Sequence, residues 1–124
     1  MYRTGILVMS DKGSRGERVD LSGPEIEKML GPNYKVDYYE IIPDEKEVIT
    51  EKIIYACDVL SLNLILTSGG TGFSLRDNTP EATLEVIERI TPGIPEAIRY
   101  YGLTKTPKSM LSRGVAGIRG KTLI

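Results

Sequence analysis

The stretch Leu64–Thr83, "LILTSGGTGFSLRDNTPEAT", places a cluster of glycines between an apolar run and a helix-start pattern. Gly69, Gly70 and Gly72 can adopt positive φ and let a ligand approach bare backbone. The N–H groups of such a loop form an anion-binding concavity, and a helix that begins near Thr79 adds the positive end of its dipole. The nearby hydroxyl donors are Thr67, Ser68 and Thr71. The pattern predicts a phosphate-binding loop, and the simpler alternative is a tight turn with a helix cap.

Asp77 follows this loop and directly precedes the predicted helix. A carboxylate beside bound phosphates would be repelled unless a cation lay between them, so Asp77 is predicted to ligate Mg²⁺ of a nucleotide substrate. The structural alternatives are that Asp77 or Asn78 caps the helix, or that Asp77 pairs with Arg76.

Asp44 is the second candidate carboxylate, and it lies in the segment "PDEKE". Glu47 follows three residues later, which fits a capping box with Asp44 as the N-cap residue. A catalytic role is also consistent with its place after a predicted strand. From the residues alone, both interpretations of Asp44 stay open.

Several familiar kinds of site are absent from the sequence. The chain has no histidine, which removes His-based triads, most zinc chemistry and the commonest general base. The pattern G-x-x-x-x-G-K-[ST] does not occur, and G-x-G-x-x-G is not completed because Leu75 stands at its last position. Any catalysis must therefore use carboxylates, Lys, Arg, hydroxyls, backbone amides and bound metal.

The bulk properties are those of a single domain spanning residues 1–124. A formal net charge of −1 and the lack of a basic run give no reason to expect nucleic acid or an anionic membrane as a partner. No apolar run is long enough to span a bilayer, and the N-terminus lacks the core of a signal peptide. The one cysteine, Cys57, excludes an intrachain disulfide. We predict a cytoplasmic protein.

The candidate residues are positioned by alternating strand and helix patterns. Strands are predicted over 4–10, 34–42, 62–67 and 121–124. Helices are predicted over 22–31, 43–57, 79–90 and 94–104, with a helical turn and glycine-rich loop over 107–120. This alternation predicts an α/β fold of three layers, α-β-α, with a mostly parallel sheet. In such sheets ligands bind at the carboxyl ends of strands, where the glycine loop would lie.

Two details of the helices are also predicted. Ser22 and Glu25 fit a capping box at the start of the first long helix. Leu84, Ile87 and Ile90 share one face of the helix predicted over 79–90.

Four segments of the chain, "LTSGGTGFSLRDNTPEAT", "VMSDKGSRGE", "IIPDE" and "MLSRGVAGIRGKTLI", carry a family resemblance. Through them, and across essentially the whole chain, the sequence resembles the molybdopterin adenylyltransferase family, the MogA- and MoaB-like proteins of molybdenum cofactor biosynthesis. The same domain occurs in gephyrin and plant Cnx proteins. The resemblance implies a Rossmann-like, molybdopterin-binding fold. Asn78 departs from the valine that the family commonly has, with no expected effect on the chemistry.

The resemblance implies transfer of AMP from MgATP to the phosphate of molybdopterin, with release of pyrophosphate. Asp77 and Asp44 match the acidic residues associated with catalysis, and Asp77 remains the expected Mg²⁺ ligand. The residues that match nucleotide- or pterin-phosphate contacts are Ser10, Asp11, Ser68, Gly69, Gly70, Thr71, Gly72, Ser112 and Arg113.

The resemblance also implies homotrimers, or hexamers in the MoaB-like branch, and handover of product to a molybdenum-insertion protein. Family members continue past the final strand, so we expect the C-terminal loop and last helix to be lacking here. Two alternatives to the enzyme stay open: a non-catalytic molybdopterin-binding paralogue, and an unrelated nucleotide or sugar-phosphate binder. The presence of both Asp44 and Asp77 favours the enzyme.

Overall fold

The computed structural model describes all residues from Met1 to Ile124 as a three-layer α/β domain. Its six-stranded sheet has the order β2-β1-β3-β6-β5-β4. The strands in chain order are β1 (Tyr2–Met9), β2 (Tyr34–Ile42), β3 (Leu64–Ser68), β4 (Arg89–Ile90), β5 (Gly117–Arg119) and β6 (Thr122–Leu123). The pairs β2–β1, β1–β3 and β3–β6 are parallel, and the pairs β4–β5 and β5–β6 are antiparallel. The predicted mostly parallel sheet is confirmed.

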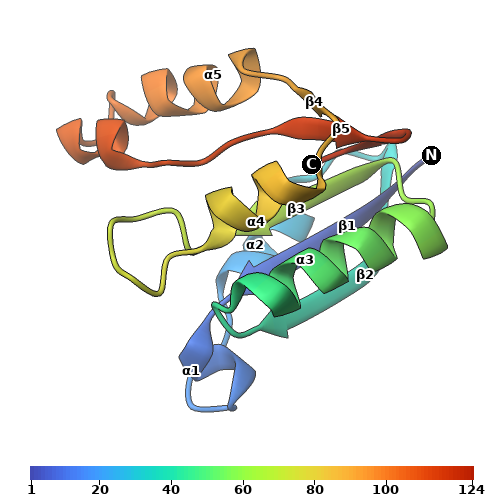
Figure 1. Cartoon of the computed structure of the whole chain (residues 1–124). Helices are drawn as coiled ribbons and strands as arrows, with labels where there is room; N and C mark the ends of the chain where they lie inside the picture. The colour runs from blue at the N-terminus through green and yellow to red at the C-terminus, as the bar shows by residue number, and fades with distance from the viewer.

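Helices lie on both faces of this sheet, with α3 and α2 on opposite sides of β1 in Figure 1. The helices are α1 (Asp11–Ser14), α2 (Ser22–Met29), α3 (Lys46–Ile54), α4 (Thr79–Val86) and α5 (Gly93–Gly102). A π-helical turn, η1 (Tyr55–Val59), continues α3, and a 3₁₀ helix, η2 (Pro107–Leu111), follows α5. No helix has the length and apolar character needed to cross a bilayer.

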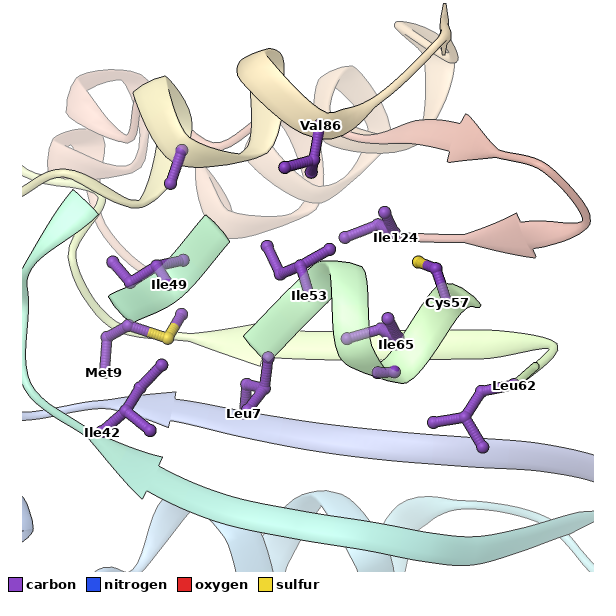
Figure 2. Packing of buried hydrophobic residues seen from close by; sticks show 12 residues of the cluster. Leu7, Met9, Ile42, Ile49, Ile53, Cys57, Leu62, Ile65, Val86 and Ile124 are labelled. Carbon is purple, nitrogen blue, oxygen red and sulfur yellow. The ribbon is translucent and has the colours of Figure 1, made fainter. Parts of the chain in front are cut away.

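The main core lies between the sheet and the layer formed by α3 and α4 (Figure 2). Leu7 and Ile65 project from the central strands toward Ile49 and Ile53 of α3, and all four are at most 1% exposed. Their burial favours folding by roughly 1.5–3 kcal/mol per side chain. This packing fixes β1 and β3 side by side, so the loops after them emerge together.

The start of α2 differs from the prediction. Ser22 and Glu25 do not form a capping box, because Leu21 occupies the N-cap position and makes no side-chain capping bond. Instead, Asp20 accepts hydrogen bonds from the backbone N–H groups of Ser22 and Gly23, both at 3.0 Å. An aspartate just before a helix can satisfy these free donors as well as serine can.

The helix predicted over 79–90 is also shorter than expected. It ends at Val86, because Ile87 adopts an extended conformation and the chain enters β4, which pairs with β5. Ile87 and Ile90 therefore lie outside the helix, and the predicted apolar face does not form. Leu84 and Ile90 are also 47% and 63% exposed. Thr83 and Val86 lie on the buried face instead. The strand pairing of β4 overrides the helical pattern of this segment.

Candidate active site

The glycine loop lies at the carboxyl end of β3, beside the loops that follow β1 and β2. Gly69 and Gly70 have φ of 96° and 71°, so the predicted positive φ is confirmed for these two glycines. Gly72 does not have a positive φ. Gly69 is exposed, which leaves its backbone accessible to a ligand.

Thr79, the first residue of α4, holds the first half of the loop. Its hydroxyl donates to the Gly69 carbonyl at 2.9 Å, and its N–H donates to the Gly70 carbonyl at 3.2 Å. A Cβ on Gly70 would clash with the Thr79 hydroxyl and lie 2.6 Å from Oδ1 of Asp44. Gly70 is therefore required for close packing inside the protein, in addition to any approach by a ligand.

The structure excludes the helix-cap interpretation of Asp44. Glu45 occupies the N-cap position of α3, and no side chain caps this helix. The Asp44 carboxylate accepts no hydrogen bond, and its Oδ1 is buried without a partner. Burial raises the pKa of Asp44, and the negative charges of Asp11 and Asp77 raise it further. A half-buried carboxylate without a partner is costly to the fold, so local structure does not account for this residue.

Asp11 joins the loops that follow β1, β2 and β3. Its carboxylate accepts two hydrogen bonds from the Arg76 guanidinium, at 2.8 and 3.1 Å, and one from the Asp44 backbone N–H at 2.9 Å. The bond from Arg76 and the one from Asp44 hold the pKa of Asp11 below its usual value. Asp11 thus fixes the Asp44 backbone, and Arg76 pairs with Asp11 rather than with Asp77.

Asp77 is fixed within its own loop. Its Oδ2 accepts a hydrogen bond from the Ser74 N–H at 3.0 Å, and its N–H donates to the Ser74 carbonyl at 3.0 Å. A Cβ on Gly72 would lie 2.7 Å from Oδ2 of Asp77, so this carboxylate borders the glycine loop. Asn78 stands at the N-cap of α4 without a side-chain capping bond. Neither predicted structural alternative for Asp77 is observed.

Arg113 contacts the other side of the loop. Its backbone N–H donates to the Thr71 carbonyl at 2.9 Å, and its guanidinium donates to the carbonyls of Gly72 and Asp77 at 2.8 and 2.9 Å. It also forms an ion pair with Glu81 of α4 at 2.7 Å. Ser112 lies beside it, but its hydroxyl accepts from the Gly114 N–H at 3.3 Å.

A cleft of about 250 Å³ adjoins the loop at the carboxyl end of β1. Ser10, Ser68 and Gly69 line it, and Ser10 also accepts a hydrogen bond from the Gly13 N–H. The structure thus brings all the predicted residues to the loops around the carboxyl ends of β1, β2 and β3, except that Ser112 and Arg113 arrive from the segment after η2. Arg18, which makes no ion pair, and the exposed Val19 also line the cleft.

Sequence reasoning missed the supporting residues Thr79, Glu81 and Arg76 in their observed roles. The sequence marks Thr79 only as a helix start, although a hydroxyl at a helix start can bind nearby backbone. Nothing in the spacing indicates that Arg76 binds Asp11, 65 residues away. The same holds for Arg113 and Glu81.

The arrangement is suited to a polyanionic ligand. A glycine loop with free backbone lies at the start of α4, and two carboxylates border it. The carboxylates would repel phosphates unless a cation were bound between them. Fold and site together give an α/β domain whose candidate ligand site lies at the carboxyl ends of its strands.

The chain belongs to the family described as "Probable molybdopterin binding domain", whose model matches residues 5–124. It is 44% identical to molybdopterin adenylyltransferase of Helicobacter pylori strain 26695, over 97% of this chain and 70% of that protein. It is 43% identical to gephyrin of Dictyostelium discoideum, over 97% of this chain and 18% of gephyrin. The crystal structure of the molybdopterin biosynthesis enzyme MoaB from Thermus thermophilus is 50% identical, with a TM-score of 0.93 over 100% of this chain and 79% of that one. The predicted family and fold class are confirmed.

Proposed function

We propose that the chain is a molybdopterin adenylyltransferase, which transfers AMP from ATP to the phosphate of molybdopterin. The observation that carries the proposal is the Asp44 carboxylate, which lies against Gly70 and has no partner in the protein. A group that is costly to the fold and borders an anion-binding loop is expected to serve a ligand. The name of the Helicobacter pylori relative supports the same activity.

The proposed reaction is an in-line displacement at the α-phosphorus of ATP. An ionised oxygen of the pterin phosphate forms a bond to this phosphorus, the bond to the bridging oxygen of the β-phosphate breaks, and pyrophosphate leaves with the electron pair. The attacking oxygen carries no proton, so the step needs no general base, which suits a chain without histidine. Catalysis then depends on positioning and on stabilisation of charge.

Backbone groups and side chains of the chain would supply both the positioning of substrates and the stabilisation of charge. The accessible backbone at Gly69 and the first turn of α4 would bind phosphate oxygens. Ser10 and Ser68 would contact substrate in the adjoining cleft. Thr71 and Gly72 are held by Arg113 through their carbonyls, which favours N–H groups that point toward the ligand.

Asp44 and Asp77 fit a magnesium ion delivered with ATP. No group of three or more acidic, His or Cys side chains is arranged to hold a metal ion. Mg²⁺ at nucleotide sites is usually held by one or two carboxylates together with substrate phosphates, so a permanent protein site is not required. The unpartnered Oδ1 of Asp44 is the strongest sign of such a ligand. When bound, Mg²⁺ would neutralise phosphate charge.

We also propose that the protein works as a homotrimer or hexamer. Apolar side chains on α5 and η2 are exposed and could be covered by another copy; these include Ile98 (66%), Tyr101 (65%) and Met110 (66%). Light scattering at several protein concentrations tests this proposal, and a monomer at all of them would contradict it. A cytoplasmic location and handover to a molybdenum-insertion protein stay predictions.

The test of function is incubation with molybdopterin and MgATP, followed by measurement of pyrophosphate and adenylylated pterin. The proposal expects both products in equal amounts from the unmodified chain, and formation of both about 100- to 1,000-fold slower in Asp44→Asn. Binding of molybdopterin without pyrophosphate release would instead indicate a non-catalytic binding module.

A further inference from the structure

Arg113, a half-buried arginine beside the candidate site, uses most of its hydrogen-bond donors within the protein. Its guanidinium makes four hydrogen bonds: Nε to the Gly72 carbonyl, one terminal nitrogen to the Asp77 carbonyl, and both terminal nitrogens to the Glu81 carboxylate. An arginine side chain has five N–H donors, so only one stays free. Its charge is also paired with Glu81.

These contacts bracket one segment of the loop. Gly72 and Asp77 lie at the two ends of the segment whose interior is closed by the bonds between Ser74 and Asp77. The planar fork of a guanidinium can hold two carbonyls in fixed relative positions, which an ammonium cannot do. The Arg113 backbone N–H adds a bond to Thr71 just before this segment.

We propose that Arg113 is a positioning residue that holds the Gly72–Asp77 segment in the shape in which the Asp77 carboxylate borders the glycine loop. The carbonyls of Gly72 and Asp77 accept hydrogen bonds from the guanidinium, whose charge is paired with Glu81, so Arg113 acts on the site through the backbone of this segment. The catalytic consequence rests on the proposed adenylyl transfer. The structural claim concerns the ligand-free protein and does not depend on that function.

The positioning role differs from direct binding of a phosphate in its effect on the ligand-free protein. Replacing a direct phosphate ligand would weaken substrate binding but would leave the ligand-free loop unchanged. A residue that holds two carbonyls and a carboxylate at once needs the fork, so Arg113→Lys should release at least one end of the segment.

The first measurement is amide hydrogen exchange, resolved by residue with NMR, on the ligand-free protein. The N–H groups of Ser74 and Asp77 both donate within the segment and therefore report its shape. We expect both to exchange faster in Arg113→Lys than in the unmodified protein, while amides in the core strands are unchanged. Unchanged exchange at Ser74 and Asp77 would overturn the proposal.

The matched control is Arg119→Lys. Arg119 has a similar set of partners, with two bonds to Asp58 at 3.1 and 2.8 Å and one to the Val86 carbonyl at 2.9 Å, but it lies outside the site. We expect no change in Ser74 or Asp77 exchange in this variant. A second variant, Glu81→Gln, removes the ion pair and leaves the two carbonyl bonds. It should leave both amides protected, and loss of their protection would contradict the assigned role of the carbonyl bonds.

The second measurement is steady-state kinetics with molybdopterin and MgATP. We expect Arg113→Lys to lower kcat by about 10- to 100-fold, as for other residues that orient a catalytic group, with little change in KM. Arg119→Lys should keep normal kinetics. A raised KM with an unchanged kcat would contradict the proposal and favour direct binding of substrate. If the unmodified protein has no activity, the proposed function fails, and the exchange data still test the contacts of Arg113.

Discussion

Asp44 and Asp77 border the same glycine loop, yet their surroundings differ. The Asp77 carboxylate accepts a hydrogen bond from Ser74, and its backbone is held by Arg113. The Asp44 carboxylate accepts none, although its backbone N–H is held by Asp11. The side chain of Asp77 therefore takes part in the hydrogen bonds of the protein, whereas only the main chain of Asp44 does.

Because of this difference, the structure indicates Asp44 more strongly than Asp77 as a ligand-binding residue, whereas the sequence pattern favours Asp77. In the sequence, Asp77 is the clearer candidate, while Asp44 has a ready explanation as a helix cap. In the structure, the Asp77 carboxylate accepts a hydrogen bond within its own loop. Asp44 is not a helix cap, since Glu45 is the N-cap residue of α3. A polar group that nothing in the protein bonds is the better indicator of a ligand.

The largest effect is expected for Asp44→Asn. If the unpartnered carboxylate serves the reaction, its replacement by a neutral group of the same shape should lower kcat/KM for adenylyl transfer by about 100- to 1,000-fold. Glu45→Gln, a change at the neighbouring exposed carboxylate, is the matched control and should leave the rate unchanged. Normal turnover in Asp44→Asn would remove this residue from the mechanism.

A smaller loss is expected for Asp77→Asn. The amide oxygen can still accept the Ser74 hydrogen bond, so the loop keeps its shape, but the neutral side chain binds a cation less tightly. We expect kcat/KM to fall by about 10- to 100-fold, with partial rescue by excess Mg²⁺. Pterin binding without nucleotide should be nearly normal, and a variant that melts well below the unmodified protein would show a mainly structural role.

Gly70→Ala tests the packing on the Asp44 side of the loop. The substitution places a Cβ at φ 71° and within 2.6 Å of Oδ1 of Asp44. The left-handed conformation alone should lower the free energy of unfolding by about 1–2 kcal/mol. Gly31→Ala is the control, since its φ is not positive and its Cβ would meet nothing within 4 Å. Urea unfolding of both variants measures the difference, and equal stability would refute the packing role of Gly70.

The smallest effect is expected for Arg76→Gln, which removes the ion pair with Asp11. Arg76 is exposed, so the loss of stability should be small and should diminish at high salt. The change should also raise the pKa of Asp11, because the bond from Arg76 is the main cause of its lowered value. Unfolding at low and high salt measures the first effect, and a salt-independent loss of stability would contradict it.

The sequence predicted the elements of this site because their signals are local. Apolar runs indicate β1 and β3, and a cluster of glycines between a strand and a helix indicates the loop with positive φ at Gly69 and Gly70. The bonds that organise the loop could not be predicted in the same way. Arg113 reaches Gly72 across 41 residues, and such a contact depends on how η2 and β5 pack rather than on spacing.

The sequence could not show, for a related reason, that Asp44 is not a helix cap. A capping box is a local pattern, but whether it forms depends on where the helix begins, and α3 begins two residues after Asp44. The bond from the Asp44 N–H to Asp11 fixes the backbone before the helix starts. That bond joins two loops that only the parallel pairing of β1 and β2 brings together.

The most direct test of the account is the thermal stability of Asp44→Asn against the unmodified protein. Burial and the charges of Asp11 and Asp77 raise the pKa of Asp44. A carboxyl with a raised pKa in the folded state favours folding when protonated, and this contribution is lost as the pH rises through the folded value. At pH 7 the ionised Asp44 therefore opposes folding.

We predict that Asp44→Asn has a Tm equal to or above that of the unmodified protein at pH 7. The difference in Tm between the two proteins should become smaller as the pH falls toward about 4, near the ordinary pKa of an aspartate. Glu45→Gln should show no comparable gain. A clearly lower Tm for Asp44→Asn at pH 7 would show that the carboxylate supports the fold, and would contradict the claim that it is held without a partner for a ligand.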